Sequence, residues 1–133
     1  MRCFYRAWPP GYVAHEMSLP QSEFWLAFDG DNEIGYLHFW VVADQASLLS
    51  MAVVPELQRR GFGRALMAFL ETRLADLGCS ELQLEVRVGN AAARSLYGEL
   101  AFVEVGRRTG YYSDTGEDAV LMSKALDSGS TAE

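Results

Sequence analysis

The stretch that most constrains the fold is Gln58–Arg64, a Gln-Arg-Arg-Gly-Phe-Gly-Arg run that follows an apolar segment and leads into a helical pattern. Gly61 and Gly63 allow a tight backbone turn whose N–H groups can approach a ligand closely. The first turn of the helix adds free N–H donors and the positive end of the helix dipole, and both attract anions. The pattern therefore predicts a phosphate cradle. The alternative is a solvated helix start whose arginines face water, because short glycine-spaced loops are common.

This loop is positively charged, whereas the whole chain is negatively charged. The loop carries three arginines, whereas the formal net charge of the chain is −7. A nucleic-acid binder needs a basic face to neutralise phosphates, so we expect no nucleic-acid partner. An acidic chain suits a basic partner or a cationic amine, or the charge serves only to keep the protein soluble.

The length of 133 residues fits one domain. We expect that domain over residues 1–126, followed by a small polar tail, 127–133, that is disordered. The longest apolar runs, Phe39–Ala43 and Leu48–Val54, are too short to cross a bilayer, and no cationic start precedes an apolar signal core. The expected location is therefore the cytoplasm, with no membrane partner.

From Glu23 onward, apolar periodicity and turn residues predict the order strand, strand, strand, helix, strand, helix, strand, strand. We expect Leu48–Val54 to be a central strand buried on both faces. The other expected elements are a short helix over Tyr12–Leu19, a hairpin of strands Glu23–Phe28 and Ile34–Val42, a helix from Phe62 to Leu77 capped by Gly78, a strand over Leu82–Val88, a helix that begins after Asn90, and strands Phe102–Val105 and Asp118–Ala125 around the loop Arg107–Gly116.

Three polar residues in the second half are candidate functional groups. Glu85 points away from the apolar neighbours in its strand, Asn90 stands at a helix start, and Tyr97 lies on the apolar stripe of that helix. Each also has a purely structural interpretation. Glu85 could be an exposed strand carboxylate beside Arg87, and Asn90 could be only an N-cap. Tyr97 could be a core tyrosine whose hydroxyl finds a hydrogen-bond partner.

Several common sites are excluded by missing residues. A Walker-type loop needs a lysine after its last glycine, but Lys124 is the only lysine in the chain, and the dinucleotide fingerprint needs a third glycine. His15 and His38 have no metal-ligand spacing to Cys3 or Cys79, so we expect no metal. Without an export signal, we expect no structural disulfide either. A phosphate-bearing ligand other than a nucleoside triphosphate or NAD remains.

Taken together, the motifs resemble the GNAT superfamily of N-acetyltransferases and, more narrowly, the RimI-type ribosomal protein alanine N-acetyltransferases. The resemblance covers roughly residues 23 to 126. It is carried by Met51-Ala52-Val53-Val54-Pro55, Gln58 to Leu66, Leu84-Glu85-Val86-Arg87, Asn90 to Ala93, Leu96-Tyr97, Arg107-Arg108, Gly110-Tyr111-Tyr112 and Gly116-Glu117-Asp118-Ala119.

This resemblance implies an α/β (α+β) GNAT fold: a mixed, mostly antiparallel twisted sheet with splayed central strands and flanking helices. It also implies acetyl-CoA as co-substrate, no metal, and direct transfer of the acetyl group to an amine. Glu85 would take a proton from the amine, through water, and Tyr97 would protonate the departing thiolate. The implied cofactor-binding residues are Ala52, Val53, Gln58, Arg59, Arg60, Gly61, Phe62, Gly63, Arg64 and Asn90.

The acceptor implied by the narrower resemblance is the N-terminal α-amine of a ribosomal protein, which is a basic protein N-terminus. An α-amine has a pKa near ~8 against ~10.4 for lysine, so it is deprotonated more easily at neutral pH. Two alternatives stay open. One is a small-molecule amine acetyltransferase, and the other is a non-catalytic acyl-CoA-binding subunit.

The chain also departs from the family pattern. The segment before Glu23 is shorter than the strand and two helices that the family usually has there. Without a first strand, Glu23–Phe28 would be an exposed sheet edge at which the chain aggregates or forms a homodimer. Ala101-Phe102 replaces the Gly-Phe of the family, which we expect to be a mild change.

Overall fold

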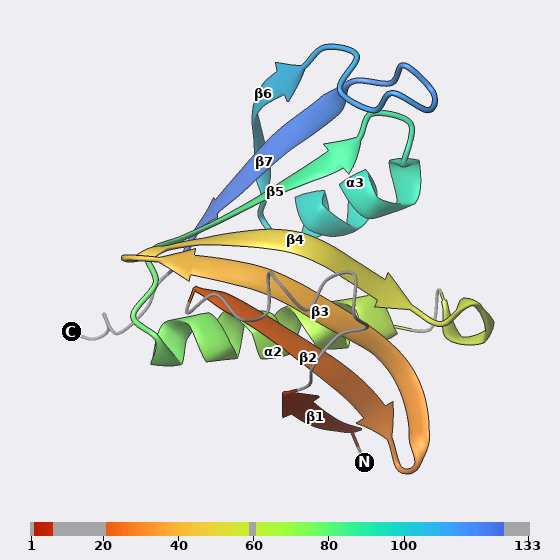
Figure 1. Ribbon diagram of the computed structural model, residues 1–133, viewed down its shortest axis with the longest axis vertical. Helices are drawn as coiled ribbons and strands as arrows, with labels where there is room; N and C mark the ends of the chain where they lie inside the picture. The colour runs from red at the N-terminus through yellow and green to blue at the C-terminus, as the bar shows by residue number, and fades with distance from the viewer. Residues whose placement is uncertain (1, 7–20, 59–60, 127–133) are drawn as a thin grey trace.

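A seven-stranded sheet in the order β1-β2-β3-β4-β5-β7-β6 organises the computed structural model (Figure 1). The structure describes residues 2–6, 21–58 and 61–126, so the expected helix over Tyr12–Leu19 and the expected tail 127–133 lie outside the described residues. The strands are β1 Arg2–Arg6, β2 Ser22–Asp29, β3 Asn32–Val42, β4 Gln45–Val53, β5 Glu81–Arg87, β6 Val103–Arg108 and β7 Ala119–Ala125.

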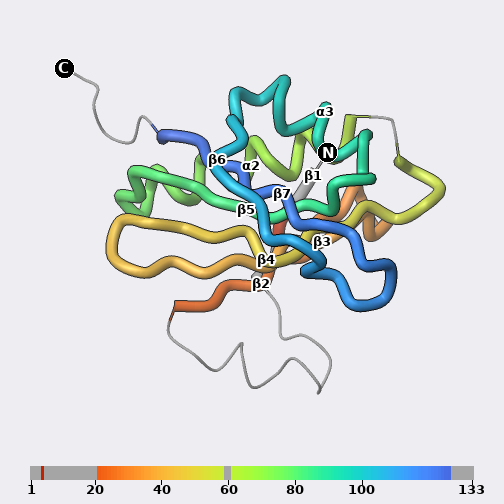
Figure 2. Tube along the Cα trace, turned by 90° about the horizontal axis from the view of Figure 1, so that it is seen from above, coloured from red at the N-terminus to blue at the C-terminus, as the bar shows by residue number. Residues whose placement is uncertain are grey.

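The strand pairing confirms a mixed, mostly antiparallel sheet. Only β4 and β5 are parallel, and the other neighbouring strands are antiparallel. A 3₁₀ turn, Pro55–Leu57, follows β4, and the helices are α2 Phe62–Asp76 and α3 Ala91–Glu99. Both helices lie on the same side of the sheet (Figure 2). Within the described parts of the chain, no helix is long and apolar enough to cross a membrane.

Helix α2 forms where the apolar spacing predicts it. Its buried residues are Phe62, Leu66, Met67, Leu70 and Leu74. Gly78 lies just beyond the helix and its C-cap Leu77, and its φ of 77° is left-handed. The Gly78 N–H donates to the Ala75 carbonyl and the Cys79 N–H to the Leu74 carbonyl, so two carbonyls of the last turn are satisfied. The predicted glycine cap is confirmed.

The prediction that Glu23–Phe28 forms an exposed sheet edge is wrong, because β1 pairs with this strand. Strands β1 and β2 pair along their lengths, from Arg2 opposite Asp29 to Arg6 opposite Trp25. The Cys-Phe-Tyr segment within β1 was too short to stand out as a strand in the sequence. Since β2 has partners on both sides, the reason for expecting a homodimer there is removed.

The expected burial of Leu48–Val54 on both faces is also wrong. Ala46 and Leu48 of β4 are buried, whereas Leu49 is 42% exposed. The cause is that β4 and β5 pair only from Gln45–Glu81 to Leu48–Leu84. Beyond Leu48 the two strands diverge, and this confirms the splayed central strands that the resemblance implied (Figure 1).

A residue in a strained conformation follows helix α3 and its C-cap Leu100. Ala101 has a φ of 76°, a left-handed conformation that costs an L-residue about 1–2 kcal/mol. Its N–H donates to the Gly98 carbonyl, and the Phe102 N–H donates to the Tyr97 carbonyl. This is the hydrogen-bond pattern of a glycine cap made without glycine, so the replacement of Gly by Ala carries more strain than the sequence suggested.

We expect Ala101→Gly to stabilise the fold by about 0.5–1 kcal/mol, because relief of left-handed strain exceeds the entropy that glycine adds to the unfolded chain. For a chain of this size that shift raises Tm by about 2–4 °C in thermal unfolding. Ala68→Gly, at an exposed position inside α2, is the control and should destabilise by about 1 kcal/mol. Equal destabilisation by both substitutions would contradict the strain at Ala101.

Candidate active site

The divergence of β4 and β5 opens two adjoining cavities, of about 420 Å³ and about 560 Å³. Both are lined by the residues at the point of divergence, Leu48 and Leu84, and by Leu49, Glu85 and Tyr112. We call the smaller one the slot and the larger one the outer cavity. Because they share these residues, the two adjoin around Glu85.

The slot brings together the three polar residues singled out in the sequence. Glu85 comes from β5, Asn90 from the start of α3, and Tyr97 from the middle of α3. Asn90 caps the helix as predicted, since its Oδ1 accepts from the Ala93 N–H at 3.1 Å. The remaining lining residues are Leu48, Leu49, Ser50, Met51, Leu84, Val86, Arg87, Ala93, Leu96 and Tyr112.

Tyr97 is buried in the core, with 8% of its surface exposed. Its ring packs against Phe102 at 5.6 Å between centroids. Burial raises the pKa of the Tyr97 hydroxyl above its ordinary value. The phenol therefore keeps its proton at neutral pH and is available as a proton donor.

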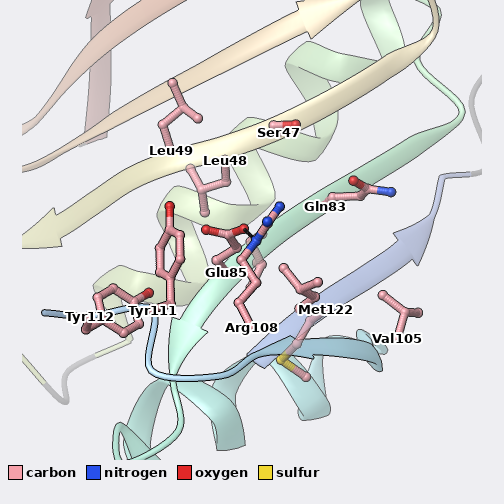
Figure 3. Close-up of a pocket in the computed structure, with 12 residues that line it drawn as sticks. Ser47, Leu48, Leu49, Gln83, Glu85, Val105, Arg108, Tyr111, Tyr112 and Met122 are labelled. Carbon is pink, nitrogen blue, oxygen red and sulfur yellow. Dashed lines mark hydrogen bonds and ion pairs between the residues drawn. The ribbon is translucent and has the colours of Figure 1, made fainter. Parts of the chain in front are cut away.

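Glu85 is paired with an arginine from another strand. Its Oε2 accepts from Arg108 Nε at 2.7 Å, and both side chains are partly open to solvent. Among the described residues nothing hydrogen-bonds Glu85 Oε1, so one carboxylate oxygen remains available to an acceptor amine or to water. Figure 3 shows the two side chains pointing toward each other.

Arg87, which the sequence placed as the neighbour of Glu85, is engaged elsewhere. Its two Nη atoms donate to the Asp114 carboxylate at 2.9 and 3.1 Å. Its guanidinium also lies 4.1 Å from the centre of the Tyr112 ring. These contacts fasten the loop between β6 and β7 to β5, and this brings Tyr112 to the junction of the two cavities.

The residues of the predicted phosphate cradle are only partly described. Arg59 and Arg60 lie outside the described residues. Gly61 has a φ of 84° and precedes α2, where a non-glycine residue would be strained. Phe62 is buried in the hydrophobic core, so its side chain is not a ligand contact.

Two further residues of the expected cofactor site have side-chain partners within the protein, and two more lie at the end of β4. The Gln58 side-chain amide donates to the Val53 carbonyl at 3.0 Å and so links the loop to the end of β4. Arg64 forms an ion pair with Glu99 between the two helices. Ala52 and Val53 lie in β4 beyond the last β4–β5 pair. Their backbone is therefore not bonded to β5.

The outer cavity is mainly apolar and aromatic. Its charged lining residues are Glu85 and Arg108, which neutralise each other, so this lining has no net negative charge that would attract a basic terminus. Figure 3 shows most of the remaining lining residues, which are Ser47, Leu48, Leu49, Gln83, Leu84, Val105, Tyr111, Tyr112, Leu121 and Met122.

Sequence reasoning missed Arg108, Tyr111 and Tyr112 as site residues. All three belong to motifs that carried the resemblance, and two adjacent tyrosines in a polar loop were a usable signal. Arg108 was not distinguishable from Arg107, because the expected strand Phe102–Val105 ended before both arginines, whereas β6 extends to Arg108 with an irregular register that is not visible in the sequence. No group of three or more His, Cys, Asp or Glu residues in the described parts of the chain is arranged to hold a metal ion.

Comparison with known proteins finds acetyltransferases both among family models and among individual relatives. Residues 1–102 match the model of the acetyltransferase (GNAT) family. The [ribosomal protein bS18]-alanine N-acetyltransferase of Escherichia coli (strain K12) is 47% identical over 85 residues, which are 62% of this chain and 57% of that protein. The putative enzyme of the same description from Bacillus subtilis is 31% identical over 120 residues, 90% of this chain and 80% of that protein.

The structural similarity extends further than the sequence alignment. The crystal structure of the E. coli ribosomal-protein-S18-alanine N-acetyltransferase superimposes with a TM-score of 0.84 at 29% identity, covering 100% of this chain and 97% of that one. Nourseothricin acetyltransferase superimposes with a TM-score of 0.74 at 28% identity, over 80% of this chain and 66% of that one. The sequence alignment with the E. coli relative spans somewhat more than half of that protein's length.

Proposed function

Because the chain belongs to the acetyltransferase (GNAT) family, we propose that it transfers the acetyl group of acetyl-CoA to the N-terminal α-amine of a ribosomal protein. The observation that carries the proposal is the slot, in which a carboxylate with a free oxygen, Glu85, and a protonated phenol, Tyr97, line one cavity. A base and an acid on a shared cavity are what direct acyl transfer to an amine requires.

The residues present fit acetyl-CoA. The slot is lined on one side by β4 residues such as Ser50 and Met51, whose backbone has no β5 partner. The left-handed Gly61 and the first turn of α2 offer N–H groups at a helix N-terminus, which suits a pyrophosphate. In this proposal Gln58 to Arg64 hold the pyrophosphate, while Ala52, Val53 and Asn90 hold the arm. When bound, acetyl-CoA supplies an acetyl group activated as a thioester.

Two side chains of this protein, Glu85 and Tyr97, carry out the proton transfers in this proposal. Glu85 accepts a proton from the acceptor ammonium, directly or through one water, so that the neutral amine attacks. The Tyr97 hydroxyl donates its proton to the sulfur that departs, and its burial keeps it protonated until then. Attack is direct, so no protein nucleophile is needed. Cys79, the described free cysteine, is fully buried, in agreement with this.

The acceptor class is proposed from the relatives. The E. coli and B. subtilis proteins are described as ribosomal protein bS18-alanine N-acetyltransferases. An apolar outer cavity beside a single carboxylate suits one ammonium group carrying a small side chain such as alanine. The proposal includes a cytoplasmic location, where ribosomal proteins are made.

Thiol release from acetyl-CoA with a panel of acceptors tests the proposal. We expect turnover with peptides that begin with alanine and at least tenfold lower kcat/KM with Nα-blocked lysine peptides, because the lysine amine costs about 3 kcal/mol more to deprotonate at neutral pH. Turnover with small amines alone would favour the small-molecule alternative. Tight acetyl-CoA binding without any turnover would favour a non-catalytic binding subunit.

A further inference from the structure

Arg108 hydrogen-bonds to Glu85, the candidate base, through only one of its N–H donors. Its Nε donates to Glu85 Oε2 at 2.7 Å, and its guanidinium lies 5.6 Å from the centre of the Tyr111 ring. An arginine has five N–H donors. Among the described residues no acceptor contacts its Nη1 or Nη2, and Figure 3 shows the side chain beside the outer cavity. These donors remain available to a substrate.

A β-bulge decides that Arg108, rather than Arg107, faces Glu85. Glu85 pairs with Leu121, and Leu121 pairs with Gly106, so these three residues share one face of the sheet. The register shifts between Glu104 and Gly106. Without this extra residue, alternation from Val103 would place Arg107 on the Glu85 face. With it, Arg107 turns to the opposite face and pairs with Glu104 at 2.8 Å.

The Glu85–Arg108 pair therefore presents an acceptor oxygen next to unused donors. An N-terminal residue carries the complementary groups, an ammonium and a carbonyl oxygen joined through one Cα. A lysine side chain has no carbonyl beside its amine. We propose that Arg108 is a specificity-determining residue, which donates to the first carbonyl of the acceptor peptide while Glu85 receives its ammonium. This inference rests on the proposed function and extends it to the choice of amine.

A purely structural role for Arg108 predicts a different result. If Arg108 only holds the Glu85 carboxylate in place, its loss should impair every acceptor equally. If it binds the first carbonyl, its loss should impair only acceptors that have one. The distinction can therefore be measured with two acceptors and two enzymes.

The test compares wild type and Arg108→Ala with an alanine-terminated peptide and with its trans-alkene isostere, in which CH=CH replaces the first amide. We expect the loss of kcat/KM caused by Arg108→Ala to be at least about tenfold larger for the peptide than for the isostere, since a hydrogen bond from a charged group is lost in only one case. Where the isostere is not acetylated, its competitive inhibition constant against the peptide replaces kcat/KM.

Equal losses for peptide and isostere would overturn the proposal. Arg107→Ala removes the same charge from the opposite face of β6 and should leave kcat/KM for both acceptors within about twofold of wild type, as expected for an exposed pair. Arg108→Lys keeps a cation beside Glu85. Since lysine lacks the planar fork, we expect Arg108→Lys to turn over the isostere at about the wild-type rate and still to lose the preference for the peptide. Retained turnover of the isostere also shows that the loss with the peptide is not caused by misfolding. A wild type that acetylates no N-terminal peptide would overturn the proposed function itself, and this inference with it.

Discussion

Glu85→Gln is expected to lower kcat for an alanine-terminated peptide by about a hundred- to ten-thousand-fold, the range that one general base contributes. The amide keeps the size of the side chain and still accepts a hydrogen bond from Arg108 Nε. It cannot accept the proton of the ammonium. Affinity for acetyl-CoA should be unchanged, because the substitution removes only the ability of this side chain to accept a proton. Single-turnover kinetics and calorimetric titration of acetyl-CoA measure the two quantities.

Glu104→Gln provides the matched control for this substitution. Glu104 is also a strand carboxylate paired with an arginine, at 2.8 Å from Arg107, but it faces away from Glu85. Its replacement should leave kcat unaltered.

The same assay tests Tyr97→Phe, which retains the ring packing against Phe102 and removes the hydroxyl that donates the proton. Full activity in Glu85→Gln and in Tyr97→Phe would remove both assigned roles.

Local patterns predicted those parts of the fold that local interactions decide. The spacing of Leu66, Leu70 and Leu74 and the glycine at 78 were sufficient for α2, since a helix and its cap depend on neighbouring residues. Asn90 was identified as a cap for the same reason. The interruption of β4–β5 pairing depends on contacts far apart in the chain. It was expected only through the family resemblance.

Two features of the site depend on sheet register, which the sequence did not reveal. The alternation of β5 placed Glu85 on the correct face but suggested Arg87 as its partner. Arg87 instead binds Asp114, and the bulge in β6 delivers Arg108. Because a shift of one residue exchanges the two faces of a strand, adjacent arginines at 107 and 108 were equivalent until the pairing of β6 with β7 was known.

Gly63→Glu is expected to weaken acetyl-CoA binding by at least about a hundredfold while leaving the fold intact. Gly63 is the second residue of α2, where its N–H is one of the free donors of the helix start. A carboxylate there takes the place of the pyrophosphate and repels it. The same carboxylate is favourable for the helix dipole by about 0.3–1 kcal/mol, so Tm should not fall.

Two substitutions at the same position separate size from charge. A Cβ at Gly63 would lie 3.4 Å from Leu96 Cδ2, an ordinary contact, so Gly63→Ala should be tolerated. Gly63→Gln has the size of glutamate without its charge and should weaken binding less than Gly63→Glu does. Calorimetric titration with acetyl-CoA, together with thermal unfolding, distinguishes the three variants. Unchanged affinity in Gly63→Glu would show that the phosphates lie elsewhere, and the interpretation of Gln58–Arg64 as a phosphate cradle would then have no support beyond its two glycines.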